Sequence, residues 1–358
     1  MRIRYVCKSW FTITRNPSFV SAYRNFHRPS VRQSHLLLIT WEKATKQHHL
    51  FSSEINEGDE ITTPTTQHLL SLSCTSCVNY GAQSANGLIC LHLSNYGGVF
   101  DNPSYPVRVL NPTTLECITL PHSSCIHPTS DVTYHFGFNP LADEYKVLQV
   151  QRLSCKGEHS WVYKIFTLGA SSWRRIEEDL DVDRLAPFDS SNSYFCKGVY
   201  ADGVMYWLTR DVILTFEFGD EKFRVMPLPQ CSRLYCRPKL VEVSGCLSII
   251  GLQDKEMELW ILKDYRNQVW VNENTQRYVV QPPKRAEYLI PLGTIHSGEL
   301  LLRSHMRKIG RTVMVHFYNR KSNILKSRQI GLPEFMFPGD SCLQPLTLFE
   351  GGSIVPLR

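Results

Sequence analysis

A β-rich unit recurs along the chain from His35 onward, at a spacing of about 40 to 55 residues, and this repeat constrains the fold more than any other feature. Its most regular copy runs from Phe195 to Pro229. Within that copy, Asp202-Gly203 is a hairpin signal between two apolar runs, and Pro227 and Pro229 end the last run. Repeats of this length, with four short strands each, are typical of β-propeller blades.

Six such units can be counted, and one more apolar run, Leu346–Phe349, follows the sixth. This extra run predicts ring closure, because it would complete the first blade and remove free sheet edges. Two mostly polar stretches, Glu54–Ser71 and Asn272–Ala286, are predicted to be loops. The sequence therefore predicts an all-β fold, a β-propeller of about six blades, with seven as the alternative.

The first residues follow a different pattern. Tyr5, Val6, Ser9, Trp10 and Ile13 fall at three- and four-residue spacing, as one face of a helix would. Asn16-Pro17 interrupts this pattern, and a second short helix is predicted from Ser18 to Phe26, before Pro29. We therefore divide the chain into a helical segment, residues 1–30, and a propeller, residues 31–358.

Charge and hydropathy argue against several classes of partner. The net charge of +6 is the small difference between 39 basic and 33 acidic residues, and no basic stripe with interleaved aromatic residues is present, so we expect no nucleic-acid partner. No apolar run is long enough to span a membrane, and the N-terminus lacks the apolar core of a signal peptide. We therefore expect the cytoplasm, the nucleus or both, where the twelve cysteines would be reduced thiols.

Motifs for catalysis or metal binding are weak. Cys74 and Cys77 have the spacing of zinc ligands, but Cys231 and Cys236 do not supply a matching second pair. The histidines form no metal-binding motif, and the sequence contains no nucleophile elbow or phosphate-binding loop. The carboxylate pairs Asp143-Glu144 and Glu177-Glu178 lie beside turn signals, so we interpret them as solvated loop charges. We expect no catalytic residue, no metal and no cofactor, and hence no enzyme.

Tryptophans recur at similar positions of the repeated units. Large aromatic side chains at such positions either pack between sheets or stack on a ligand. We favour packing between blades for this set, which comprises Trp161, Trp173, Trp207, Trp260 and Trp270.

Several short motifs follow one another in a fixed order over roughly residues 84 to 270. They are Ser84–Cys90, Asn111–Thr114 with Leu120-Pro121, Phe136–Pro140 followed by Asp143–Val147, Ser172–Arg174, Gly203–Trp207 and Glu258–Tyr265. In this order they resemble the plant F-box proteins that carry an F-box-associated, kelch-like β-propeller domain.

The N-terminal segment adds to this resemblance. Arg4–Trp10, followed by Pro17–Phe19, is similar to the second half of an F-box, whereas the Leu-Pro-led first half is missing from this sequence. The resemblance implies that an adaptor protein of a cullin–RING ligase contacts this segment, through Tyr5, Val6, Cys7, Lys8 and Trp10. We expect this docking to be weakened or lost without the first half.

The resemblance implies a substrate-recognition subunit of a cullin–RING (Skp–cullin–F-box) E3 ubiquitin ligase, with the propeller recruiting a protein substrate that the sequence does not identify. Two alternatives remain open. The chain would be a stand-alone or dominant-negative binding protein if it does not dock on the ligase. A propeller enzyme would need polar side chains that converge at the central channel, and no spacing in the sequence encodes this.

Overall fold

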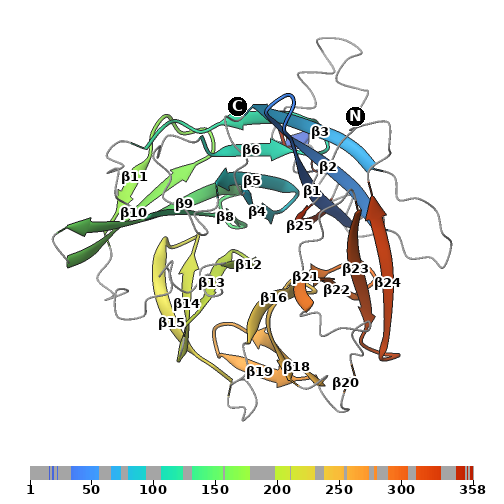
Figure 1. Cartoon of the computed structure of the whole chain (residues 1–358). Coiled ribbons are helices and arrows are strands. Elements are labelled where there is room, and N and C mark those ends of the chain that lie inside the picture. The colour runs from blue at the N-terminus through green and yellow to red at the C-terminus, as the bar shows by residue number, and fades with distance from the viewer. Residues whose placement is uncertain are drawn as a thin grey trace.

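A computed structural model of the chain describes residues 16, 18–19, 22, 34–55, 66–73, 80–93, 106–123, 131–155, 158–177, 198–209, 211–229, 238–253, 256–273, 278–279, 289–304, 312–331, 344–350, 353 and 355–357. These residues form six antiparallel sheets arranged around a centre, as Figure 1 shows. The fold is a six-bladed β-propeller, so the predicted fold class and blade number are confirmed.

The first three blades, in order from the centre outward, hold these strands. Blade 1 contains β25 (Gln344–Glu350), β1 (Ser34–Glu42), β2 (Gln47–Ile55) and β3 (Thr66–Ser73). Blade 2 contains β4 (Tyr80–Ala85), β5 (Leu88–Leu93), β6 (Arg108–Asn111) and β7 (Glu116–Thr119). Blade 3 contains β8 (Asp131–Asn139), β9 (Glu144–Cys155), β10 (Glu158–Thr167) and β11 (Arg174–Ile176).

The remaining three blades follow the same order. Blade 4 contains β12 (Val199–Ala201), β13 (Val204–Leu208), β14 (Val212–Glu217) and β15 (Lys222–Pro227). Blade 5 contains β16 (Lys239–Val243), β17 (Cys246–Gln253), β18 (Glu256–Asp264) and β19 (Val269–Asn272), and β20 (Tyr278–Val279) also pairs with β18. Blade 6 contains β21 (Leu289–Thr294), β22 (Leu300–Ser304), β23 (Thr312–Asn319) and β24 (Ile324–Gly331).

The ring closes within blade 1. β25, from the C-terminal end of the chain, pairs antiparallel with β1, and the register joins Ser34 to Glu350, with a bulge between Leu37 and Leu38. The predicted role of the run Leu346–Phe349 is therefore confirmed: it supplies the innermost strand of the first blade.

Both loop predictions are wrong in part. Glu54 and Ile55 end β2, and β3 begins at Thr66, so the stretch Glu54–Ser71 contains strand at both ends. The stretch Asn272–Ala286 begins at the last residue of β19 and contains β20. β3 is the outermost strand of its blade, and its mixture of exposed and buried positions hides the alternation that marks a strand.

Tight hairpins join consecutive strands. In Asn86-Gly87, Asp202-Gly203 and Ser244-Gly245 both residues have positive φ, which a type I′ turn requires. The Asn-Pro motifs make a longer turn, in which the Oδ1 atom of Asn139 accepts the backbone N–H of Leu141 at 3.1 Å. Asp143 closes that turn at φ 57°. The sequence motifs therefore fix the register of neighbouring strands through turn geometry.

The core lies between the blades. One cluster joins β9, β10 and β11 of blade 3 to blade 4, and the fully buried Trp207 lies within it. The other four tryptophans named above are half-buried, and Trp161 packs against the same cluster. Trp173 packs at the junction of blades 2 and 3, and Trp260 and Trp270 at the junction of blades 4 and 5. The predicted role of the tryptophans as packing between blades is confirmed for this set.

Little of the N-terminal segment belongs to the described residues. Ser18, Phe19 and Ala22 are helical, inside the second predicted helix, and the Oδ1 atom of Asn16 accepts the backbone N–H of Ser18 at 2.9 Å. The first predicted helix and the division between residues 30 and 31 lie outside the described residues and stay predictions. Among the residues that the structure describes, no helix has the length and apolar character to cross a membrane.

Candidate functional site

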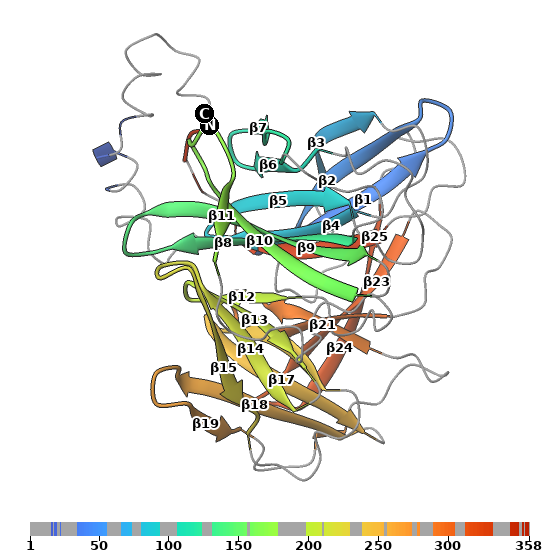
Figure 2. The same ribbon diagram turned by 90° about the vertical axis from the view of Figure 1, so that its left-hand side faces the viewer.

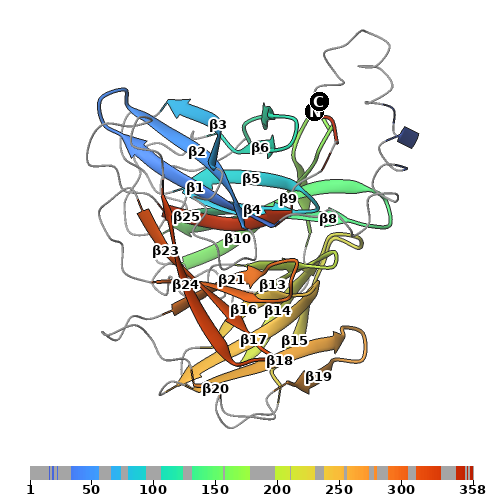
Figure 3. The ribbon, with the colours of Figure 1, turned by 90° about the vertical axis from the view of Figure 1, so that its right-hand side faces the viewer.

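The propeller has two faces of different construction. Blades 2 to 6 each begin with their innermost strand, whereas blade 1 begins with β1 and receives its innermost strand, β25, last. Because neighbouring strands are antiparallel, consecutive connections alternate between the two faces of the propeller. On the face that we call the turn face, the connections are the short segments 86–87, 112–115, 140–143, 168–173, 202–203, 218–221, 244–245, 265–268, 295–299 and 320–323, with 56–65 as the longer exception. In Figure 2 the β8–β9 and β18–β19 turns of this face point to the left, and in Figure 3 they point to the right.

The opposite face carries the long connections, and we call it the connection face. These connections are 94–107, 120–130, 177–198, 228–238, 273–288, 305–311 and 332–343. Short connections also occur there, such as the β1–β2 turn, which points to the right in Figure 2 and to the left in Figure 3. Long connections on a rigid scaffold are the usual place for binding residues, so this face is the candidate interaction surface.

Hydrogen bonds tie neighbouring blades together along the turn face. They come from side-chain hydroxyl groups and reach a backbone carbonyl of a neighbouring blade. The phenol of Tyr145 donates to the carbonyl of Asn86, and that of Tyr200 to the carbonyl of Phe138, both at 2.9 Å. At the closing junction the hydroxyl of Ser84 donates to the carbonyl of Leu348 at 2.6 Å. The turn face is therefore part of the scaffold.

A C-terminal tail, residues 353 and 355–357, crosses the turns of blade 2. The side-chain amide of Asn111 donates to the carbonyl of Val355 at 2.8 Å, and the backbone N–H of Leu357 donates to a carboxylate oxygen of Glu116 at 3.2 Å. Leu357 is buried in the cluster between blades 2 and 3. The tail fastens the closing strand β25 to the blade beyond it.

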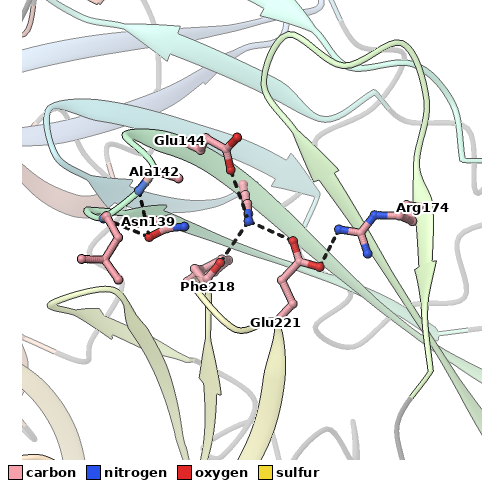
Figure 4. Close-up of polar contacts among 8 residues, drawn as sticks. Asn139, Ala142, Glu144, Arg174, Phe218 and Glu221 are labelled. Atoms are coloured by element: carbon pink, nitrogen blue, oxygen red, sulfur yellow. Dashed lines mark hydrogen bonds and ion pairs between the residues drawn. The ribbon is translucent and has the colours of Figure 1, made fainter.

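An ion-pair cluster centred on the buried Lys146 joins blades 3 and 4 at the same face, as Figure 4 shows. The ammonium group of Lys146 on β9 donates to the carbonyl of Phe218 at 3.1 Å and to Glu221 at 2.9 Å, and Glu144 lies 3.4 Å away. The other oxygen of Glu221 accepts from Arg174 at 2.5 Å. The ammonium group of Lys146 has three acceptors within the cluster, which marks it as a structural contact between blades.

The two cations of this cluster set the ionisation of Glu221. Burial acts to raise the pKa of Glu221, but the hydrogen bonds and charges of Lys146 and Arg174 outweigh burial and lower the pKa below its ordinary value. The carboxylate is therefore held in its charged form. Both carboxylate oxygens of Glu221 bind structural partners, Lys146 and Arg174, so the lowered pKa of Glu221 does not indicate acid–base chemistry.

Blade 1 contains a polar chain that the sequence analysis missed. The Oγ atom of Ser71 lies 2.9 Å from Nδ1 of His49, and Nε2 of His49 lies 3.2 Å from Glu42. The order resembles a serine hydrolase triad, but Ser71 lies within a strand, and a similar His–Ser pair recurs in blade 6. There the fully buried His316 lies 2.8 Å from Ser327. A His–Ser pair that recurs across the third and fourth strands of two blades is a packing element.

The residues proposed from sequence have the following positions. Tyr5, Val6, Cys7, Lys8 and Trp10 lie outside the described residues, as do Cys74, Cys77, Cys231 and Cys236. Asp143 lies in a turn, Glu144 is 43% exposed, and Glu177 is exposed, so these three carboxylates are surface charges. Across the described residues, no group of three or more His, Cys, Asp and Glu side chains is arranged to hold a metal ion.

Comparison with known proteins identifies the family to which this chain is similar. The sequence profile of the F-box associated beta propeller domain matches residues 36–342. The Arabidopsis thaliana F-box protein At1g53550 is 26% identical over 93% of this chain and 81% of its own length. The F-box protein CPR1 from the same organism is 23% identical over 82% of this chain and 72% of its own length. The F-box/kelch-repeat protein At3g04660, also from Arabidopsis thaliana, is 24% identical over 75% of this chain and 67% of its own length. The chain therefore belongs to the F-box associated β-propeller family of plant F-box proteins.

Proposed function

We propose that this chain is the substrate-recognition subunit of a cullin–RING (Skp–cullin–F-box) E3 ubiquitin ligase, and that it binds its protein substrate through the connection face. The observation that carries the proposal is the difference between the faces: the turn face is occupied by contacts between blades, whereas the connection face carries the long segments between strands. Loops on a rigid scaffold vary without cost to the fold, which suits a receptor whose partner differs between relatives.

The mechanism needs no catalytic side chain on this chain. A ligase receptor acts by holding its substrate close to a ubiquitin carrier, so that transfer becomes effectively intramolecular. β1 begins at Ser34 on the turn face, and its register with Glu350 fixes that position. Because it precedes β1 in the chain, we infer that the segment that holds Tyr5, Val6, Cys7, Lys8 and Trp10 is presented on this side. In this arrangement the adaptor and the substrate approach opposite faces, in the cytoplasm or the nucleus.

Exchange of one connection tests the substrate half of the proposal. Residues 178–196, which precede β12, would be replaced by a short Gly-Ser linker, and tagged wild type and variant would be recovered from plant cells in which the proteasome is inhibited. We expect proteins that co-purify with the wild type to be missing from the variant, a readout of substrate binding that does not depend on docking to the ligase. A matched turn-face variant, Leu141→Ser, changes a side chain that is 94% exposed and should retain them. Loss in the turn-face variant alone would contradict the proposal.

Isothermal titration against purified adaptor tests the ligase half. The short segment predicted to be helical is too small to bury the ~1,200 Å² of a stable specific interface, so we expect it to bind the adaptor no more tightly than roughly micromolar. Addition of the first half of an F-box should tighten this binding. If neither form binds, the propeller acts as a stand-alone or dominant-negative binding protein, and the ligase role is wrong.

A further inference from the structure

The positive charge of the chain is concentrated in blade 6. Residues 289–331, which hold this blade, contain eight basic residues and one acidic residue, Glu299. The whole chain has a net charge of +6, so the residues outside this blade contribute slightly more negative than positive charge. One blade therefore differs in charge from the rest of the ring.

Strand pairing places three of these cations on one face of the blade. Arg303 on β22 lies opposite Val315 on β23, and Val315 lies opposite Arg328 on β24, so the three side chains form one row. Lys326 shares this face, because side chains two residues apart on a strand point the same way. Strand geometry separates Arg303 from Arg328 by roughly 10 Å, and Lys326 from Arg328 by roughly 7 Å. We call Arg303, Lys326 and Arg328 the basic edge of blade 6.

The basic edge lies where a further strand could be added. Val315 is buried in the core cluster between blades 6 and 1, whereas Lys326 is exposed and Arg328 is half-buried. β24 is the outermost strand of its blade, as Figure 1 shows, and within the described part of the chain it pairs with β23 alone. At its end, the hydroxyl of Thr66 donates to the carbonyl of Gly331 at 3.5 Å. The stretch before Gly331 offers backbone groups for pairing.

Cations on other outermost strands have carboxylate partners in their own or the next blade. Arg174 of β11 forms an ion pair with Glu221, and Arg224 of β15 forms ion pairs with Glu217 and Asp220. Residues 300–333, which include β22, β23 and β24, contain no Asp or Glu. The outer strands of blade 6 therefore supply no carboxylate to match their own cations, and a negatively charged partner would complement them.

We propose that the basic edge binds an extended acidic segment of a partner protein, which adds to β24 as a fifth strand of blade 6. Carboxylates at alternate positions of such a segment lie roughly 7 Å apart, so two of them face Lys326 and Arg328 as cross-strand pairs. Hydrogen bonds between the backbones supply affinity, and the charge pairs supply selectivity. This surface is separate from the connection face, and the inference does not rest on the ligase role.

Two other occupants fit the basic edge less well. A second copy of the same edge would bring Lys326 and Arg328 close to like charges, which destabilises strand pairing. A single-stranded nucleic acid binds largely by stacking its bases on aromatic side chains. The aromatic residues of β23, Phe317 and Tyr318, are buried in the core, so they offer no surface for stacking. An acidic protein segment is therefore the favoured partner.

Fluorescence anisotropy with the full chain and a labelled peptide of alternating Glu and Thr tests the charge pairs. We expect saturable binding at low salt, and we expect the double variant Lys326→Glu, Arg328→Glu to bind at least about tenfold more weakly. The double variant Lys43→Glu, Lys46→Glu is the matched control, because it makes the same change in net charge at two exposed residues of the β1–β2 turn. With both variants folded by circular dichroism, equal weakening would overturn the proposal.

Methylated peptides test the added strand. Every second N–H of an added strand bonds to its neighbour, so N-methylation of the Glu residues or of the Thr residues should abolish binding in one case and spare it in the other. Equal affinities of the two methylated peptides would overturn the strand addition. No binding of the unmethylated peptide at about 1 mM, the weak end of specific binding, would overturn the proposal. Tighter binding of a single-stranded oligonucleotide of equal charge would indicate a nucleic-acid surface and would also overturn it.

Discussion

The turn face and the connection face are built from opposite ends of the same strands, yet they use their polar groups in different ways. On the turn face, Tyr145, Tyr200 and Lys146 each bond to a backbone carbonyl of the neighbouring blade. On the connection face, segments such as 177–198 and 332–343 separate consecutive strands. The described polar contacts of the turn face join neighbouring blades, and this difference supports the proposal that the connection face binds the substrate.

This difference has an energetic basis. A hydrogen bond between blades contributes roughly 1 kcal/mol, but loss of a buried partner costs more, because the remaining group stays desolvated. Lengthening a loop costs only about 0.6 kcal/mol for each doubling of its length. Substitutions should therefore have large effects where blades meet and small effects in the long connections.

Removal of the closing strand should have the largest effect. Deletion of residues 344–358 leaves β1 without its inner neighbour and opens the ring, so we expect loss of soluble protein or of the cooperative thermal transition. Deletion of residues 351–358 alone, which keeps β25, should lower the melting temperature by less. A melting temperature unchanged by the larger deletion would show that closure in blade 1 does not stabilise the ring.

Trp207→Ala tests the packing between blades 3 and 4. Trp207 is fully buried beside His135 and Phe223, so its loss should lower the free energy of unfolding by about 3–5 kcal/mol. Chemical denaturation measures this. A loss below about 1 kcal/mol, far under the range for buried aromatic residues, would contradict the packing role.

Substitution of Gly137 and of Gly219 tests how tightly blades 3 and 4 pack at their junction. A Cβ atom on Gly137 would lie 2.0 Å from the ring of Phe218, so Gly137→Ala should destabilise by about 1–3 kcal/mol through overpacking. At Gly219 the nearest atom would be the Asn139 Oδ1, at 3.7 Å, which is an ordinary contact. Gly219→Ala should therefore stay within about 0.5 kcal/mol of wild type. Equal effects of the two would show that the blades adjust at this junction.

The substitution Glu221→Gln should have a smaller effect on the free energy of unfolding, and this effect should depend on pH. The folded-state pKa of Glu221 is below its ordinary value of 4.5, so its stabilising contribution is present above that pH and is lost as the pH falls through the folded pKa. The stability gap between wild type and variant should narrow on acidification. A gap that is constant from pH 7 to about 3 would mean that the Lys146 and Arg174 pairs do not favour the charged form.

Replacement of residues 178–196 by a short linker should have the smallest effect on stability. Loop closure changes slowly with length, so we expect a change below about 1 kcal/mol in the free energy of unfolding, together with loss of protein partners. A large destabilisation would show that this connection contributes to the stability of the fold, and it would contradict the proposed difference between the two faces.

Much of the fold could be predicted from the sequence because turn chemistry and apolar runs are local. The Asp202-Gly203 hairpin and the run Leu346–Phe349 each specified a pairing that the structure contains. β4 was not recognised, because its sequence, Tyr80–Ala85, consists largely of small and polar residues that suit the crowded centre of the ring. At Gly81 a Cβ atom would lie 2.5 Å from the His92 ring, so a glycine is needed at this position of β4. Because glycine is uncommon in strands, it gave no strand signal in the sequence.

The candidate surfaces were harder to predict. The alignment of Arg303 with Arg328 depends on the register of β22, β23 and β24, which leaves no sequence motif. The contact of Lys146 with Glu221 joins residues of two blades and depends on how the blades pack. Recognition by loops has no general sequence code, so the substrate is not predicted from residues alone.

The pairing of β25 with β1 joins two strands that are synthesised far apart in time. β1 leaves the ribosome early, whereas β25 comes from residues 344–350. At about 5–20 residues per second, the ribosome takes roughly 15 to 60 seconds to make the chain between them. During that interval the inner edge of β1 has no strand to pair with, and an unpaired edge is prone to aggregation. Nascent chains of this protein should therefore depend on chaperones until β25 has been made, more than a propeller whose blades each consist of consecutive strands would.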